Sequence, residues 1–189
     1  MSEKITDNKW LNLFKTEKPD GGDYFFVSRK KNPDTEKAAD AIVIIAYVDN
    51  EGDPLKMVIT KEFRPPIDDY EYGLPAGLVN DGESLFDTVK RELKEETGLD
   101  AISIISTSPQ VYSSAGMTDE SVVMVFVRAS GTISDEYIED DENIQAFTMT
   151  SDEVSTLLWP WGPGKVKKFG AKGWAIMDHF ARTGKLWTE

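Results

Sequence analysis

Three glutamates close together are the feature of this sequence that most directly suggests chemistry. Glu92, Glu95 and Glu96 are spaced i, i+3 and i+4, so a helix would carry their carboxylates on one side. Like charges placed this way repel one another, and Glu96 also falls at the edge of the apolar side of that helix. Mg2+ prefers such oxygen ligands and shares its coordination with phosphate groups. The spacing favours metal-dependent phosphate chemistry, with a solvated acidic helix face as the alternative.

The residues around these glutamates also stand at fixed distances. Gly77 is followed six positions later by Glu83, and Arg91 directly precedes Glu92. With Leu93, the two further glutamates, Gly98 and Leu99, residues 77–99 resemble the Nudix box at every fixed position. The resemblance implies a Nudix fold, which is an α+β arrangement with a mixed sheet between helices in an α/β/α sandwich. It also implies hydrolysis of a nucleoside diphosphate linked to another moiety.

The resemblance assigns metal ligands within the box. In several relatives the backbone carbonyl just before the first glycine binds metal, which adds Ala76 to the carboxylates. The implied cofactor is Mg2+, with Mn2+ as a substitute. The residues implied as ligands are Ala76, Glu92, Glu95 and Glu96.

Glu83 and Arg91 have an implied supporting role in catalysis. By resemblance they pair and hold the loop against the box helix, while Gly77 lets the backbone turn closely. The alternative is a surface ion pair, worth about 0 to 1 kcal/mol.

Two segments ahead of the box point to a subgroup. Leu74-Pro75-Ala76-Gly77, together with Lys61-Glu62-Phe63-Arg64-Pro65, looks like the ADP-ribose pyrophosphatase group. Arg64 would then face the diphosphate, because a planar guanidinium suits bidentate phosphate contact. A strand-end arginine without a ligand is the alternative. The segment 113–120 is similar to a Ser-Pro-Gly segment of that group, but Ala115 replaces the usual proline.

Hydrolysis also needs a carboxylate base that activates a water molecule. In ADP-ribose pyrophosphatases this base can lie on a late acidic loop just before a strand. Here residues 139–143 precede Ile144, so Glu142 is the first choice and Glu120 the second. The alternative for the acidic loop is a solvated turn.

Tyrosines near the expected strands are candidates for binding the base of a nucleotide. Tyr70 and Tyr112 could stack on adenine, although aromatic residues beside strands more often serve packing. We therefore treat both as substrate-binding hypotheses.

The leading functional hypothesis is Mg2+-dependent cleavage of ADP-ribose, or a related nucleoside diphosphate sugar, into a nucleoside monophosphate and a sugar phosphate. Another Nudix substrate is the alternative: a dinucleotide, a nucleoside triphosphate or a coenzyme. A further alternative is an ADP-ribose sensor without turnover. The resemblance also implies a homodimer in which the N-terminal strands help to form the partner's pocket.

The elements that must position these residues follow from periodicity and turn signals. A helix is expected within 82–98, because apolar residues recur at helical spacing between Ser84 as N-cap and Gly98 as the stop. Residues 41–48 and 55–63 read as a hairpin. Other expected strands are 24–28, a pair within 70–79, 102–106, 122–128 and 144–149; further helices are expected after Ser151 and over about 165–182.

Composition limits the classes of protein. The 189 residues suggest one domain, here 41–189, with residues 1–40 as a small N-terminal β extension that could serve dimerisation. The net charge of −13 disfavours nucleic acid as a partner, so a small molecule bridged by metal is expected instead. There is no Cys, which excludes thiolate chemistry. No signal-like or membrane-length apolar stretch is present, so we expect a cytoplasmic protein that does not bind membranes.

Overall fold

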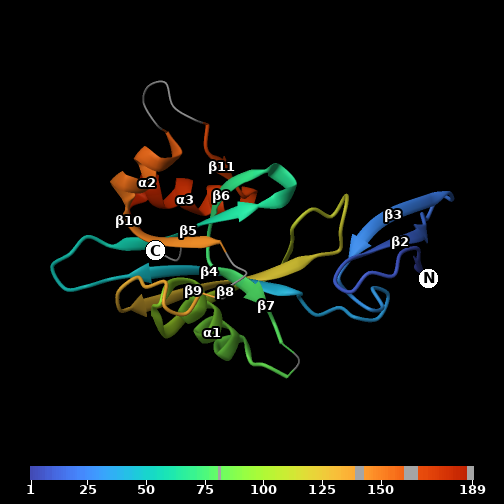
Figure 1. The fold of residues 1–189 in the computed structure, drawn as a ribbon, viewed down its shortest axis with the longest axis horizontal. Helices are drawn as coiled ribbons and strands as arrows, with labels where there is room; N and C mark the ends of the chain where they lie inside the picture. The colour runs from blue at the N-terminus through green and yellow to red at the C-terminus, as the bar shows by residue number, and fades with distance from the viewer. Residues whose placement is uncertain (81, 139–142, 160–165, 187–189) are drawn as a thin grey trace.

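The computed structural model describes residues 1–80, 82–138, 143–159 and 166–186. A large mixed sheet has helices on both faces, and a smaller sheet of N-terminal strands lies to one side (Figure 1). The α/β/α arrangement expected from the sequence is therefore confirmed. The strands of the large sheet are β4 (Ala41–Val48), β5 (Lys56–Arg64), β6 (Asp69–Gly73), β7 (Ala76–Leu78), β8 (Asp100–Tyr112), β9 (Ser121–Ser130), β10 (Ile144–Thr150) and β11 (Lys168–Phe169).

Strand β4 is central, and two different strands pair with one of its edges. It runs parallel to β9 along its whole length. On the other edge it pairs with β7 at residues 41–43 and with β5 only at Tyr47 and Val48. The predicted hairpin therefore exists only next to its turn, after which β5 pairs with β6 on one side and β10 on the other. This divergence places β5 and β7 on opposite sides of the cavity described below.

The core lies on both faces of β4. Ile42 and Ile44 pack with the apolar side of α1 (Leu85–Thr97), whereas Ile45 and Tyr47 pack with α2 (Ser151–Leu158) and α3 (Ala171–Thr183). A strand covered on both faces has a continuous apolar sequence, as residues 41–48 do. Figure 1 shows α1 on one side of the sheet and α2 and α3 on the other.

Helix α1 begins and ends as the sequence predicts. The Ser84 side chain accepts a hydrogen bond from the Asp87 amide at 3.2 Å, and Gly98 ends the helix in the left-handed conformation with φ 74°. Val89 and Leu93 are fully buried against the sheet. Because these two residues fix the rotation of the helix, Glu92 and Glu96 are brought to its edge beside β7.

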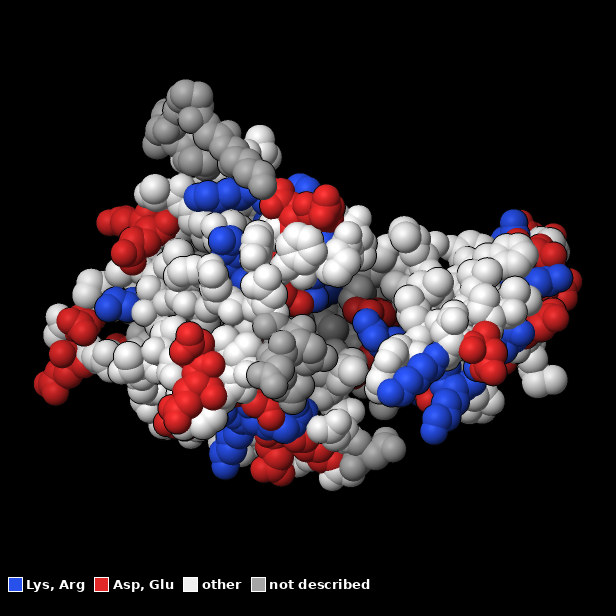
Figure 2. All heavy atoms as spheres, in the orientation of Figure 1, with Lys and Arg blue, Asp and Glu red and all other residues white. Residues whose placement is uncertain are grey.

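The N-terminal residues form a separate three-stranded sheet of β1 (Glu3–Lys4), β2 (Asn12–Glu17) and β3 (Asp23–Ser28). Within this sheet Phe14 stacks on Phe26, with ring centroids 5.7 Å apart. A part-buried lysine joins this unit to residues just before β4 and β9: Lys30 Nζ lies 3.2 Å from Asp40 and 3.3 Å from Asp119. Basic side chains gather where the unit meets the rest of the chain (Figure 2).

The structure corrects three expectations. Strand β1 and the bounds of β2 were not predicted within the expected N-terminal β extension, and β8 extends to Tyr112, well beyond 102–106. The last helix begins at Ala171 rather than near residue 165, because residues 168–169 pair with β6 and Gly170 is the N-cap. No helix in the described part of the chain combines the length and apolarity needed to cross a bilayer.

Candidate active site

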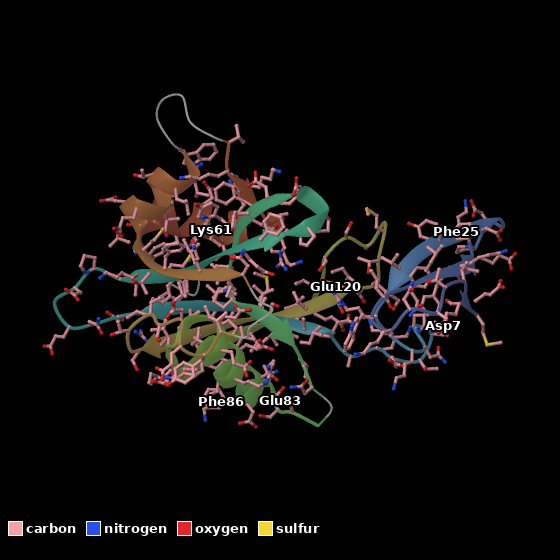
Figure 3. The ribbon with its side chains drawn as sticks, in the orientation of Figure 1. Asp7, Phe25, Lys61, Glu83, Phe86 and Glu120 are labelled. Carbon is pink, nitrogen blue, oxygen red and sulfur yellow. The ribbon has the colours of Figure 1, made fainter. Side chains whose placement is uncertain are left out.

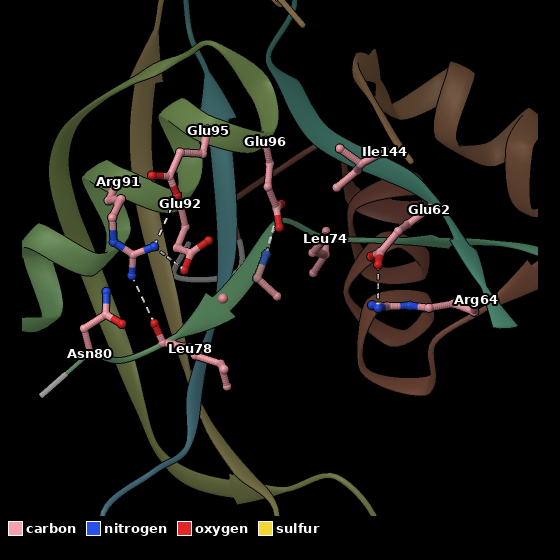
Figure 4. A pocket seen from close by; sticks show the side chains of 12 residues that line it. Glu62, Arg64, Leu74, Leu78, Asn80, Arg91, Glu92, Glu95, Glu96 and Ile144 are labelled. Carbon is pink, nitrogen blue, oxygen red and sulfur yellow. Dashed lines mark hydrogen bonds and ion pairs between the residues drawn. The ribbon is translucent and has the colours of Figure 1, made fainter. Parts of the chain in front are cut away.

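A cavity of about 340 Å³ opens between α1, β5 and β7 (Figure 4). The acidic side of α1 forms one wall, and the end of β5 forms the facing wall. Ala76, Gly77 and Leu78 supply backbone along its floor. The charged residues that line it are Glu62, Arg64, Arg91, Glu92, Glu95 and Glu96.

Gly77 is needed for space rather than for a turn. Its φ is not positive, so the backbone conformation does not demand glycine. A Cβ built at this position would overlap the Glu92 carboxylate. The sequence analysis expected glycine here because the backbone turns closely. The structure gives a different reason: β7 and α1 lie too close together to admit a side chain at position 77.

Glu96 is a buried carboxylate. It is 7% exposed, and its Oε2 accepts a hydrogen bond from the Ala76 amide at 3.2 Å. The position that the sequence places at the edge of the apolar stripe is thus enclosed between α1 and β7. A buried carboxylate is stabilised by such contacts and by positive charge.

Arg91 is the centre of the charged network on the helix wall. Its Nε and Nη2 each donate to Glu83 at 2.9 Å, and Nη2 also donates to the Leu78 carbonyl at 3.0 Å. Nη1 donates to Glu92 at 2.6 Å and to Glu95 at 3.2 Å. The Arg91 hydrogen bonds lower the pKa of Glu83 to about 2, and they raise the pKa of Arg91. The expected Glu83–Arg91 pair is present, and Arg91 also orients two box glutamates, which sequence reasoning did not predict.

The donor set fits a hard divalent cation. Four carboxylates and two guanidinium groups line the cavity, which leaves an excess of two negative charges, as many as one divalent cation neutralises. The carboxylates offer a metal ion only oxygen ligands. Within the described residues, no group of three or more acidic or His side chains is already arranged around a common metal position. Glu92 and Glu95 instead point to Arg91, so metal binding requires their reorientation.

The facing wall carries the predicted residue Arg64 and an acid that the sequence analysis did not assign. Arg64 lies 2.6 Å from Glu62 and 3.1 Å from Glu71. Burial raises the pKa of Glu62, with Glu71 adding to the rise and Arg64 opposing it. Strand alternation was the available signal, because residues 62 and 64 share one face of β5.

The remaining predicted residues do not line this cavity. Tyr70 packs edge-on against Phe63, with ring centroids 5.6 Å apart, and its hydroxyl accepts from Asn143 at 3.2 Å. Tyr112 lines a different cavity of about 280 Å³ beside the N-terminal unit. Glu120, labelled in Figure 3, accepts a hydrogen bond from Ser113 at 3.0 Å and is not among the residues that line this cavity. Glu142 lies outside the described residues. Their roles stay predictions.

The fold and the cavity together define a class of protein: an α/β/α domain in which one helix presents a set of glutamates to an arginine-lined cavity. The chain belongs to the Nudix family, since the family description "NUDIX domain" matches residues 38–169. The resemblance stated from residues 77–99 is thereby confirmed.

Sequence relatives agree with this membership, and a solved structure shares the fold. An "ADP-ribose pyrophosphatase" of Saccharomyces cerevisiae is 30% identical over 155 residues, which is 78% of this chain and 67% of the relative. An "ADP-sugar pyrophosphatase" of Mus musculus is 31% identical over 68% of this chain and 60% of its own length. The chain thus spans about two thirds of these relatives. The crystal structure of an "ADP compounds hydrolase" covers 98% of this chain and 95% of its own, with a TM-score of 0.64 and 14% identity, which is a likeness of fold.

Proposed function

We propose that this protein is a Mg2+-dependent pyrophosphohydrolase that cleaves ADP-ribose, or a related nucleoside diphosphate sugar, into a nucleoside monophosphate and a sugar phosphate. The observation that carries the proposal is the cavity that four carboxylates and two arginines line, with at least one acid and an arginine on each of its two walls. Such a cavity can hold a diphosphate and the cation that accompanies it. The names of the Saccharomyces cerevisiae and Mus musculus relatives support the substrate class.

Glu92, Glu95 and Glu96, with the Ala76 carbonyl, would hold Mg2+, or Mn2+ in its place. When bound, the cation supplies charge neutralisation and lowers the pKa of a coordinated water. Glu83 acts through Arg91, which positions Glu92 and Glu95 on the helix wall.

Arg64 is proposed to bind the diphosphate from the facing wall. Its guanidinium is planar and always charged, and it lines the same cavity as the box glutamates. Tyr70 is proposed to contact the part of the substrate that extends past Arg64. It lies on β6 opposite Phe63, the residue before Arg64 on β5. Tyr112 is proposed to contact the base from its separate cavity.

Glu142 is the proposed general base, with Glu120 as the second candidate. Ile144, two residues after Glu142, lines the cavity, which supports the late acidic loop as the source of the base. The Glu120 carboxylate is instead engaged by Ser113 and lies 3.5 Å from Arg29. Glu142→Gln should therefore reduce turnover more than Glu120→Gln.

A substrate panel tests the proposed function. Purified protein with Mg2+ is incubated with ADP-ribose, ADP-sugars, dinucleotides, nucleoside triphosphates and coenzyme A, and the products are identified by mass spectrometry. Preferred release of monophosphate from ADP-ribose or an ADP-sugar supports the proposal. Preference for another compound supports the broader Nudix alternative, whereas tight ADP-ribose binding without cleavage under Mg2+ and Mn2+ supports a sensor.

We also propose that the protein is a homodimer in which residues 1–40 take part. The N-terminal unit exposes several large apolar side chains, which favours their burial in an interface. The exposed fraction is 66% for Trp10 and 53% for Phe25. Analytical ultracentrifugation should give twice the mass of one chain, and a monomer at micromolar concentration would contradict the proposal.

A further inference from the structure

We propose that Glu62 and Glu71 are positioning residues that hold the Arg64 guanidinium in the orientation that receives the diphosphate. The inference deepens the proposed function and rests on its assignment of Arg64. The two carboxylates come from neighbouring strands, β5 and β6, and reach the guanidinium at different nitrogens.

Two of the three nitrogens of Arg64 are fixed by these acids. Nη1 donates to Glu62 Oε1 at 2.6 Å, and Nε donates to Glu71 Oε2 at 3.1 Å. Within the part of the chain that the structure describes, Nη2 has no hydrogen-bond partner. The pair of contacts therefore sets the plane of the guanidinium and leaves one nitrogen for a phosphate oxygen. Figure 4 shows Glu62 and Arg64 joined on the wall that faces Glu96.

The register of the sheet gives independent support. Glu62 and Glu71 are direct cross-strand partners in the β5–β6 ladder. Like charges placed opposite each other across two strands destabilise a sheet. Here the arrangement is compensated because Arg64 bridges both carboxylates, so the three residues form one unit.

The start of α3 leaves room for this unit. A Cβ built on Gly170 would lie 2.9 Å from Glu71 Oε1, so any larger residue would push the carboxylate aside. Gly170 is also the N-cap of α3 and has a φ of −68°, a conformation that alanine adopts without strain. The glycine at position 170 is thus explained by the space that Glu71 requires.

Holding Arg64 matters because its side chain is otherwise free to move. It is 47% exposed in the structure, and a long arginine side chain loses rotamer freedom when it binds a ligand. Contacts that fix the side chain beforehand remove part of that cost and improve orientation. Loss of one contact should therefore weaken diphosphate binding by about 2- to 10-fold.

A spectroscopic test examines the contacts without any ligand. The Nε–H resonance of Arg64, assigned with Arg64→Lys, is followed in protein labelled with nitrogen-15. Glu71→Ala should shift this resonance and speed its exchange with water, whereas Glu71→Gln keeps an acceptor oxygen and should change it less. Gly170→Ala should reproduce part of the Glu71→Ala effect. An unchanged resonance in Glu71→Ala would overturn the inference.

A binding cycle examines the consequence for the ligand. Dissociation constants for ADP-ribose are measured by calorimetry in EDTA, so that no hydrolysis occurs. Glu62→Ala should raise the constant about 2- to 10-fold in the wild-type background and leave it unchanged when Arg64 is already alanine. Glu51→Ala, on the exposed turn after β4, is the matched control and should have no effect.

The outcomes separate this inference from the proposed function. Equal effects of Glu62→Ala in both backgrounds would overturn the positioning role, whatever the enzyme hydrolyses. If the effect of Glu62→Ala on ADP-ribose binding in EDTA depends on Arg64, and no compound of the panel is hydrolysed, the positioning role is supported while the proposed function fails.

Discussion

The Glu92 carboxylate occupies the space in which a side chain at position 77 would stand. Gly77 lies on β7 and Glu92 on α1, so this contact sets how closely the acidic helix approaches the strand that supplies Ala76. The spacing of the box is therefore a packing requirement as well as a set of chemical groups. Gly77 and Glu92 thus limit each other's position.

Gly77→Ala should displace Glu92 and reduce turnover about 100-fold, because a displacement of about 1 Å at a reacting centre costs that much. Steady-state kinetics on the best substrate of the panel checks this. Gly116→Ala is the control, since a Cβ there meets nothing within 4 Å. Equal activity of the two variants would contradict the role assigned to the close contact.

Arg91→Lys should lower metal affinity or turnover by about 10- to 100-fold, as expected for residues that orient metal ligands. Lysine keeps the charge but cannot reach Glu83, Leu78 and Glu92 together, because it lacks the planar fork. Calorimetric titration with Mn2+ measures the change. Arg182→Lys, on the exposed pair with Asp178, should behave as wild type.

Glu83 should make stability depend on acid pH. Its pKa is lowered from 4.5 to about 2 by the Arg91 hydrogen bonds, so its contribution is complete above about pH 4.5 and is lost as pH falls toward 2. The free energy of unfolding in urea with EDTA should therefore differ between wild type and Glu83→Gln at pH 6, and the difference should shrink near pH 3. A constant difference at both pH values would contradict the pairing. Glu51→Gln should show no such trend.

Lys30→Met should loosen the N-terminal unit. The Lys30 and Asp40 side chains are 9% and 7% exposed, so loss of this part-buried pair should lower the free energy of unfolding by more than the roughly 1 kcal/mol that bounds an exposed pair. Hydrogen exchange should rise across β2 and β3 before it rises in β4. Lys4→Met, which removes a largely exposed pair with Asp7, should change stability by less than about 1 kcal/mol. Uniform exchange across the chain would argue against a separate unit.

Much of the fold could be predicted because local patterns were strong. Strand β4 is apolar throughout, and α1 has its cap, its stripe and its stop in sequence. The bounds of β2 were not predicted because its polar and charged residues lack a clear alternation. Strand β8 was underestimated because it contains Pro109, several serines and register shifts against β9.

The helix wall of the site was predictable for a similar reason, since the box residues are close in sequence. The facing wall was harder to predict from the sequence. The contact of Glu71 with Arg64 and the space at Gly170 depend on how β5, β6 and the start of α3 assemble. Glu62 was the exception, as its position two residues before Arg64 already placed both on one strand face.

Hydrolysis of ADP-ribose in water labelled with oxygen-18, with Mg2+ present, tests the central claim most directly. Mass spectrometry should find a nucleoside monophosphate and a sugar phosphate, with the label in one of them. Glu92→Gln and Glu96→Gln should lower the rate by at least about 100-fold, because each removes a proposed metal ligand. Full turnover in both variants, or no labelled product from the wild type, would contradict the account.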